Sequence, residues 1–324
     1  MDVVGSDISK RTFDVALLLG GGKYRTRAGF ANTAAGHAEF VAWLKKHAPA
    51  AAVGMEATGS YHEALADRLV AEGFAVYVIN PSQIAAYAKS ELGRTKTDRM
   101  DAKLIARFCQ AQCAIGGKLH PYVPLPPAQR KLKALVLRLE EVKGMQQMES
   151  NRGQTASAAV QASIDSLLAT LRAEITRLEK EIRRHVNDHP DLRGGRELLD
   201  SIPGISDTTI AWLLAYLGDT RQFSDVREVV AFVGLDPRIR ESGTWKGQTR
   251  ISKCGHALLR AKLYMPAIVA KTHNPIIRAF CQRLAAKGKP GKVIIVAAMR
   301  KLLHIAWGVL QRNQPFDPQL AVAG

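Results

Sequence analysis

The C-terminal quarter of the chain lacks acidic residues. From Ser242 to Phe316 there is no aspartate or glutamate, while fourteen lysines and arginines fall in this stretch. The rest of the chain carries 32 Lys and Arg against 29 Asp and Glu, a balance of only +3. A surface with charge of one sign attracts a polyanion, because each cation placed against a phosphate releases condensed counterions. This absence favours a nucleic acid as the partner; the alternatives are a surface kept basic only for solubility and an RNA-scaffold protein.

Cysteines and long hydrophobic runs are also scarce. Four cysteines are too few and too scattered for a disulfide framework, which predicts a reducing compartment. Cys109 and Cys113 lie four apart on a predicted helix with His120 beyond, but no second ligand pair follows at zinc spacing, so we interpret both as core cysteines. The apolar run from 293 to 310 is interrupted by charged residues, and no secretion signal is evident. We expect a soluble, cytoplasmic, nucleoid-associated protein with no membrane partner.

The first 127 residues alternate short apolar runs with helical patterns, which is typical of an α/β layer. The runs at 2–7, 12–19 and 23–30 predict an antiparallel meander, and those at 51–55 and 75–79 predict two further strands separated by helices. Ser6 occupies a first-strand position where an aliphatic side chain would pack more naturally. The segment 116–127, with four prolines and two glycines, predicts the exit from this domain.

Residues 128–192 form a second segment, with apolar residues at helical spacing. The series Ile164, Leu168, Leu171, Ile175, Leu178 and Ile182 is a sustained heptad seam on a charged helix. It predicts an antiparallel coiled-coil hairpin or an oligomerisation helix; the alternative is an amphipathic helix packed on its own domain.

Residues 193–324 predict a basic, mostly α-helical domain. Ile202-Pro203-Gly204-Ile205 separates two predicted helices between Leu198 and Leu217, as in a helix-hairpin-helix element. Such a hairpin presents backbone N–H groups at the start of its second helix, which suits a nucleic-acid phosphate.

Four carboxylates are candidates for a metal site. Asp7 and Glu56 end predicted neighbouring strands, and Asp98 and Asp101 lie three apart at the start of a predicted helix. Four carboxylates brought together repel one another unless a divalent cation lies between them, and an all-oxygen site suits Mg²⁺ or Mn²⁺. The alternatives are a turn cap for Asp7, a helix N-cap for Asp98 and a solvated strand end for Glu56.

Ser242 opens the acid-free stretch within Glu241-Ser242-Gly243-Thr244, and the nearby glycines predict a tight, exposed loop. A serine hydroxyl becomes a nucleophile only when a neighbour removes or stabilises its proton, for which cations or a metal would serve. By composition alone, a Ser-Gly pair is usually only a turn.

Several motifs in order resemble those of a known family. They are Gly5-Ser6-Asp7-Ile8-Ser9-Lys10, Met55-Glu56-Ala57-Thr58-Gly59, Lys96-Thr97-Asp98-Arg99-Met100-Asp101-Ala102, Ile202-Pro203-Gly204-Ile205, Glu241-Ser242-Gly243 and Ser252-Lys253-Cys254-Gly255-His256. Together they resemble the DEDD transposases of insertion sequence family 110, also called bridge-RNA-guided recombinases, over essentially the whole chain.

The resemblance implies an RNase H-like (RuvC-like) N-terminal domain holding Mg²⁺ through Asp7, Glu56, Asp98 and Asp101. It implies that Ser242 attacks a DNA phosphodiester, forming a covalent protein–DNA intermediate that leads to strand exchange and a Holliday-like junction. It also implies double-stranded donor and target DNA, a structured guide RNA and a homo-oligomer, dimer or tetramer. From the local charge we expect nucleic-acid contacts from Lys246, Arg250, Lys253, Arg260, Lys262, Lys287, Lys289 and Lys292.

Overall fold

The computed structural model describes residues 2–57, 59–90, 98–114, 119–238, 241–242, 245–247 and 250–319. For residues 98–100, 241–242 and 245–246 it describes the backbone alone. The chain divides into two compact units, Met1–Pro124 and Leu125–Gly324. The α/β and mostly helical regions predicted from the sequence occupy different units.

The N-terminal unit is built on a mixed sheet with strand order β3-β2-β1-β4-β5. The first three strands form an antiparallel meander, and β4 and β5 run parallel to β1. This strand order confirms the predicted RNase H-like fold. The elements are β1 (Val3–Ile8), β2 (Thr12–Leu19), η1 (Gly20–Gly22), β3 (Lys23–Ala31), α1 (Ala34–His47), β4 (Ala52–Glu56), α2 (Glu63–Ala71), β5 (Ala75–Ile79), α3 (Pro81–Ser90) and α4 (Asp98–Ala114).

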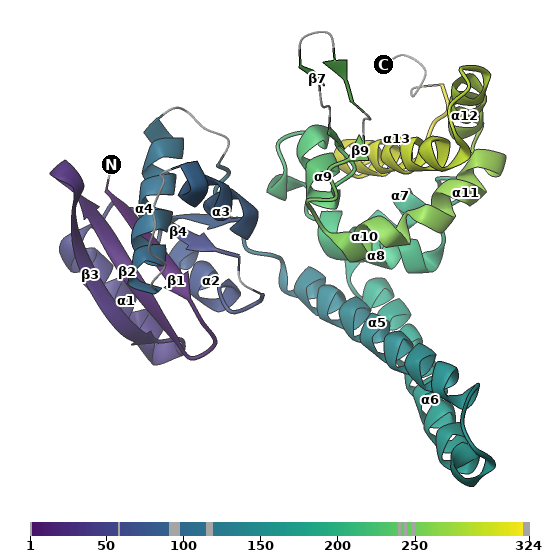
Figure 1. Ribbon diagram of the computed structural model, residues 1–324, viewed down its shortest axis with the longest axis horizontal. Coiled ribbons are helices and arrows are strands. Elements are labelled where there is room, and N and C mark those ends of the chain that lie inside the picture. Colours follow the sequence, from purple (N-terminus) through teal and green to yellow (C-terminus); the bar gives the residue numbers. More distant parts are fainter. Residues whose placement is uncertain are drawn as a thin grey trace. The chain divides into compact units, whose positions relative to one another are not determined.

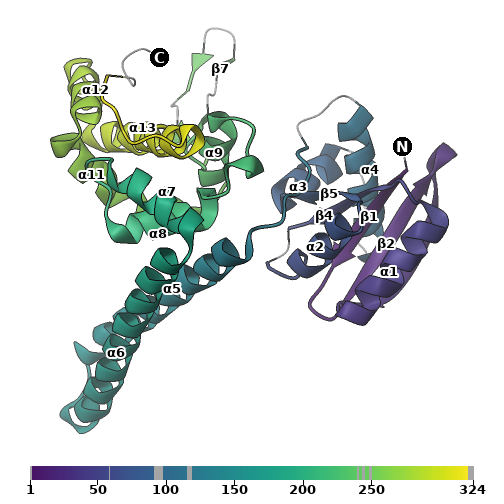
Figure 2. The same ribbon diagram turned by 180° about the vertical axis from the view of Figure 1, so that it is seen from behind.

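Alternation along the strands gives this sheet two buried faces. Val4 and Val53 point into a core with Phe40 of α1 and Leu65 of α2. Val3 points to the other face, where it packs with residues of α4 including Ile105. Figures 1 and 2 show α1 and α4 on opposite sides of the sheet. The period of two in the strands therefore places β1 between two helical layers.

The C-terminal unit begins with a long antiparallel helix pair, α5 (Pro127–Gly153) and α6 (Ala158–Asp188), visible as the projecting hairpin in Figure 1. Ile164, Leu168, Leu178 and Ile182 of the heptad seam are buried. The predicted coiled-coil hairpin is confirmed within one chain, and its inner end joins the core of the other helices.

The remaining elements of this unit enclose one apolar core. Almost every residue of α8 is buried, including Trp212 and Leu213. Leu302 and Trp307 of α13, which packs on α7, α9, α11 and α12, belong to the same core. The elements are α7 (Pro190–Asp200), α8 (Asp207–Leu217), η2 (Thr220–Gln222), α9 (Val226–Val233), β6 (Pro237–Arg238), β7 (Glu241–Ser242), β8 (Trp245–Lys246), β9 (Arg250–Ile251), α10 (Ala257–Lys262), α11 (Tyr264–His273), α12 (Pro275–Ala286) and α13 (Gly291–Arg312).

Helix α13 is long and apolar enough to cross a membrane by length and composition. Half of its most apolar window, 50%, is buried inside the protein. The helix therefore has the burial expected of a core helix in this unit.

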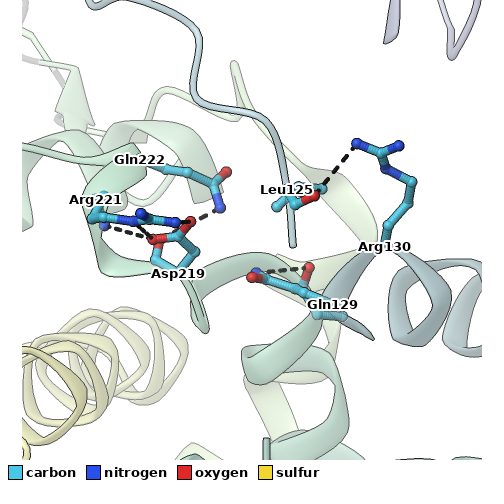
Figure 3. Close-up of polar contacts among 7 residues, drawn as sticks. Leu125, Gln129, Arg130, Asp219, Arg221 and Gln222 are labelled. Carbon is cyan, nitrogen blue, oxygen red and sulfur yellow. Dashed lines mark hydrogen bonds and ion pairs between the residues drawn. The ribbon is translucent and has the colours of Figure 1, made fainter. Parts of the chain in front are cut away.

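Two polar contacts hold the start of α5 and the turn after α8 (Figure 3). The Gln129 side chain donates to the carbonyl of Ala215 at 3.4 Å. In η2, Arg221 makes a bidentate pair with the buried carboxylate of Asp219, with Nε and Nη2 at 2.8 and 2.7 Å. This pairing lowers the pKa of the Asp219 carboxyl.

Candidate functional site

Asp7 and Glu56 lie next to each other at one end of the sheet. β1 and β4 are parallel, and Ser6 is in register with Met55. Asp7 and Glu56 each follow by one residue, and both are half-buried. Because the carboxyl ends of parallel neighbours meet at one edge, the two acids share that edge, as predicted.

Two glycines let helix α4 rest directly on these strands. A Cβ at Gly5 would lie 2.0 Å from the carbonyl oxygen of Ala102, and one at Gly54 would lie 2.2 Å from Sγ of Cys109. Helix α4 therefore meets β1 through its backbone at Gly5 and meets β4 through the side chains of Ile105 and Cys109 at Gly54. Side chains at these positions would push the helix off the sheet.

The same contact places Asp101 at the acidic edge. Asp101 directly precedes Ala102 and is half-buried. Helix α4 runs antiparallel to β1, because Ile105, later in the helix, packs with Val3, earlier in the strand. Gly5 and Asp7 project to the same face because they are two apart on a strand. Three of the four predicted acids thus belong to one end of one face.

The fourth predicted acid, Asp98, is the first residue of α4. Its backbone is described, but its side chain lies outside the described residues. Among the described residues, no three His, Cys, Asp or Glu side chains are grouped closely enough to hold a metal ion as they stand. The donor set at this edge consists of carboxylates only, which fits a hard cation such as Mg²⁺ better than a soft one.

Asp14 is an additional acid that the sequence analysis missed. It is directly opposite Asp7 in the β1–β2 pair, and opposed residues project to the same face. Its Oδ1 accepts the Gly29 N–H at 2.8 Å, where the β2–β3 register shifts. Asp14 therefore helps to hold β3 in place. The sequence feature that could have identified Asp14 is the length of the β1–β2 hairpin, because that length fixes which residue lies opposite Asp7.

The interpretation of Cys109 as a core residue is confirmed. Its thiol is buried between α4 and Gly54, and burial raises its pKa to about 12. A thiol with so high a pKa stays protonated at neutral pH and is a poor metal ligand. Cys113 is exposed.

Ser242 lies in a narrow β-hairpin of the C-terminal unit. At the base of the hairpin β6 pairs with β9, and β7 pairs with β8 so that Ser242 is in register with Trp245. The structure therefore places Ser242 in a paired strand, β7 (Figure 1), while Gly243 and Thr244 of the predicted loop lie outside the described residues. The side chains of Ser242 and of the predicted nucleic-acid contact Lys246 lie outside the described residues.

A hydrogen-bonded clamp closes the base of this hairpin. Ser252 Oγ donates to Asp236 Oδ1 at 2.5 Å, and the Ser252 N–H donates to the Asp236 carbonyl at 2.8 Å. The Cys254 N–H in turn donates to Ser252 Oγ at 3.3 Å. The two ends of the segment that carries Ser242 are thereby tied together.

Beyond the clamp, the chain packs closely on the end of α9. A Cβ at Gly255 would lie 2.5 Å from the Phe232 carbonyl oxygen. The His256 N–H donates to that carbonyl at 2.7 Å, while His256 Nδ1 accepts the Leu259 N–H and caps α10. Burial, with a smaller effect of Lys133, lowers the pKa of His256, which favours the neutral ring that the cap requires.

The structure separates the predicted nucleic-acid contacts into two groups. Arg260 donates to the Val233 carbonyl at 2.9 Å, and Lys262 pairs with Glu140 at 2.6 Å and lies over the ring of Trp212. These two cations already hold the C-terminal unit together. The exposed members of the predicted set are Arg250, Lys253, Lys287, Lys289 and Lys292.

The predicted helix hairpin is formed by α7 and α8. Its Gly204 has a positive φ of 103°, and a Cβ there would lie 2.8 Å from Ala270 of α11. Asn274 reaches the Pro203 carbonyl at 3.5 Å. The turn is thus packed against α11, and phosphate binding by the α8 N-terminus stays a prediction.

Comparison with family models identifies both halves of the chain. Residues 4–156 match a DEDD-type IS110 model described as "Transposase". Residues 196–282 match a model described as "Transposase IS116/IS110/IS902 family". The two matches occur in the order in which the motifs follow one another.

Known proteins align over much of the chain, one of them over nearly its full length. The chain is 34% identical over 326 residues to a pilin gene-inverting protein of Moraxella lacunata, covering 98% of each chain. It is 26% identical over 282 residues to the transposase for insertion sequence element IS1111A of Coxiella burnetii, covering 75% of this chain and 73% of the relative. Among solved structures, Thermus thermophilus RuvC matches 38% of this chain and 100% of its own, with 18% identity and a TM-score of 0.29.

Proposed function

Because the chain belongs to the IS116/IS110/IS902 family of transposases, and is therefore a DNA transposase/recombinase, we propose that it performs RNA-guided, site-specific recombination with Ser242 as nucleophile. The observation that carries the proposal is the location of Asp7, Glu56 and Asp101 at one edge of an RNase H-like sheet. The name of the Moraxella relative, an inverting protein, further favours a reaction that rejoins DNA after cutting it.

The acidic edge is proposed to hold Mg²⁺ or Mn²⁺ through Asp7, Glu56, Asp98 and Asp101. When bound, the ion would position a phosphate and stabilise charge on the attacking and leaving oxygens. The protein's own contribution is to hold the carboxylates in place: the β1–β4 pairing aligns Asp7 with Glu56, and the contact at Gly5 fixes the start of α4.

In the proposed reaction, Ser242 Oγ forms a bond to the phosphorus of a DNA phosphodiester. The bond from phosphorus to the leaving oxygen breaks, and that strand end departs as a hydroxyl, the serine proton being transferred away. A hydroxyl from the exchange partner then attacks the phosphoserine and releases the enzyme. The number of phosphodiester bonds is conserved, so recombination through a Holliday-like junction needs no external energy source.

Sequence choice is proposed to come from a structured RNA that pairs with donor and target DNA. The support is the resemblance, together with the acid-free stretch 242–316 and its exposed lysines, which favour polyanion binding. Because the acids and Ser242 lie in different units, the halves are proposed to come from different subunits of a dimer or tetramer.

The test is to purify the protein from its host, sequence the RNA that copurifies, and assay Mg²⁺-dependent strand cleavage on DNA complementary to it. We expect one structured RNA, and cleavage that Asp7→Asn abolishes. Cleavage unaffected by substitution of all four acids would instead indicate a scaffold protein with a contaminating nuclease. Cleavage that needs the acids but leaves no protein on DNA would indicate a RuvC-like junction nuclease that uses water.

A further inference from the structure

Beside the acidic edge, a cleft of about 550 Å³ opens on the α1–α2 side of the N-terminal unit. It is lined by Lys10, Asn32, Thr33, Ala34, His37, Tyr61, Ala64 and Arg68. Neither aspartate nor glutamate is among these residues. The lining combines cationic side chains with one exposed aromatic ring.

The cleft is built by the two loops that follow the acidic strand ends. Lys10 is three residues beyond Asp7 in the β1–β2 turn, and Tyr61 is five residues beyond Glu56 in the β4–α2 connection. The acids project to the α4 face and the cleft opens on the α1–α2 face, so a strand with a phosphate at the acidic edge would reach the cleft by passing around the ends of β1 and β4. Short stretches of backbone therefore connect Lys10 and Tyr61 of the cleft to Asp7 and Glu56 of the proposed reaction centre.

Asn32 ties the two loops together. Its Nδ2 donates to the Ser9 carbonyl at 3.0 Å and to the Tyr61 carbonyl at 3.1 Å. Its Oδ1 is then the acceptor for His37 Nε2 at 2.7 Å, so His37 donates. Burial and the nearby Arg68 lower the pKa of His37. At neutral pH its imidazole is therefore uncharged, and it donates a hydrogen bond to Asn32.

Two side chains in the cleft are available to a ligand. Tyr61 is 42% exposed. Lys10 is exposed and forms no hydrogen bond or ion pair with any residue in the described part of the chain. Arg68 and Lys45 share the single carboxylate of Glu72, so this cluster keeps a net positive charge at the cleft wall.

A cationic group beside an exposed aromatic ring matches one nucleotide of an unpaired strand, because cations meet the phosphate and the ring stacks on the base. We propose that this cleft binds a nucleotide of the DNA strand next to the cleaved phosphate, with the base on Tyr61 and the phosphate on Lys10. The assignment to DNA rests on the proposed function, since the acidic edge is where that function places the scissile strand.

The test uses full-length protein carrying Asp7→Asn, so that binding is measured without cleavage. The probe is a short single-stranded oligodeoxynucleotide with 2-aminopurine, whose fluorescence falls when the base stacks. Tyr61→Leu is expected to weaken binding about five-fold or more and to abolish the quenching, while Tyr61→Phe retains both. The matched control is Leu19→Ala, because Leu19 is 37% exposed in the same unit but lies at the end of the sheet away from Asp7; this variant should bind like the parent.

A second arm tests the phosphate contact and the source of the strand. Lys10→Gln is expected to reduce the slope of log affinity against log salt by about 0.7, the value for one phosphate contact on a single strand, whereas Tyr61→Leu leaves the slope unchanged. Equal binding by the Tyr61→Leu and Leu19→Ala variants overturns the site. Tyr61-dependent binding of the matched RNA but not of the DNA overturns the DNA assignment. Because cleavage is never measured, these results are separate from the fate of the serine mechanism.

Discussion

Ser252 and Asp236 join the two ends of the hairpin that carries Ser242, through a side-chain hydrogen bond of 2.5 Å and a backbone bond of 2.8 Å. A nucleophile must be held in place to react, and misplacement by about an ångström can cost on the order of a hundredfold in rate. The clamp is therefore expected to position Ser242 without touching substrate.

Ser252→Ala removes this clamp's side-chain bond, so we expect slower formation of the protein–DNA adduct with little change in DNA affinity. Ser252→Thr keeps a hydroxyl and should restore much of the rate. The measurement is single-turnover adduct formation alongside equilibrium binding. Equal rates for the alanine variant and the parent would show that the clamp does not position Ser242.

The contact between Gly5 and Ala102 predicts a steric effect on the acidic edge. Gly5→Ala would place a methyl group 2.0 Å from a backbone carbonyl oxygen, so α4 must move. We expect a loss of about 1–3 kcal/mol in the free energy of unfolding and a large loss of cleavage, because Asp101 moves with the helix. Gly20→Ala is the matched control, since nothing lies within 4 Å of a Cβ there. If the Gly5→Ala and Gly20→Ala variants have equal free energies of unfolding and equal cleavage activity, the placement of α4 on β1 is wrong.

Substitution of Ser6 is expected to change the free energy of unfolding in the opposite direction. Its side chain is fully buried, and its hydroxyl has no hydrogen-bond partner among the described residues. An unsatisfied buried hydroxyl is costly, so Ser6→Ala should raise the free energy of unfolding by about 1 kcal/mol. Denaturant unfolding of both proteins measures it. A loss of similar size would reveal a partner for the hydroxyl.

His256 predicts a pH dependence for the C-terminal unit. Burial lowers its folded pKa below the ordinary 6.5, so the unfolded chain takes up a proton first as pH falls. The stabilisation is complete above about pH 6.5 and declines as pH falls toward the folded pKa. His256→Asn keeps a cap acceptor without titrating, so its stability relative to the parent should improve from pH 7 to pH 5. Thermal melts across this range measure the change, and a constant difference would contradict the linkage.

The strands and most helices of the N-terminal unit could be predicted because each has its own local signal. Apolar runs bounded by turns predicted β1 to β5 of this unit. In the C-terminal unit, heptad spacing predicted the α5–α6 hairpin. The proximity of Asp7 and Glu56 could be predicted because strand order places the ends of β1 and β4 together. The contacts of Gly5 and Gly54 with α4 could not, because no local pattern says which helix covers which strand.

The roles of individual cations were harder to predict for the same reason. Lys262 pairs with Glu140, which is 122 positions away, and Arg260 donates to a carbonyl of α9. Charge along the sequence cannot separate such residues from the exposed Lys287 and Lys289. Asp14 was missed because its meaning depends on the register that puts it opposite Asp7.

The central claim is that Ser242 becomes covalently linked to DNA in a reaction that needs the acids of the other unit. The most direct measurement is to trap the reaction in denaturant, digest the protein and locate the modified peptide by mass spectrometry. We predict a nucleotide remnant on Ser242, none on Ser252, and no adduct from Ser242→Ala or Asp7→Asn protein. An adduct that persists in Ser242→Ala protein, or cleavage by the parent with no adduct on any residue, would contradict the account.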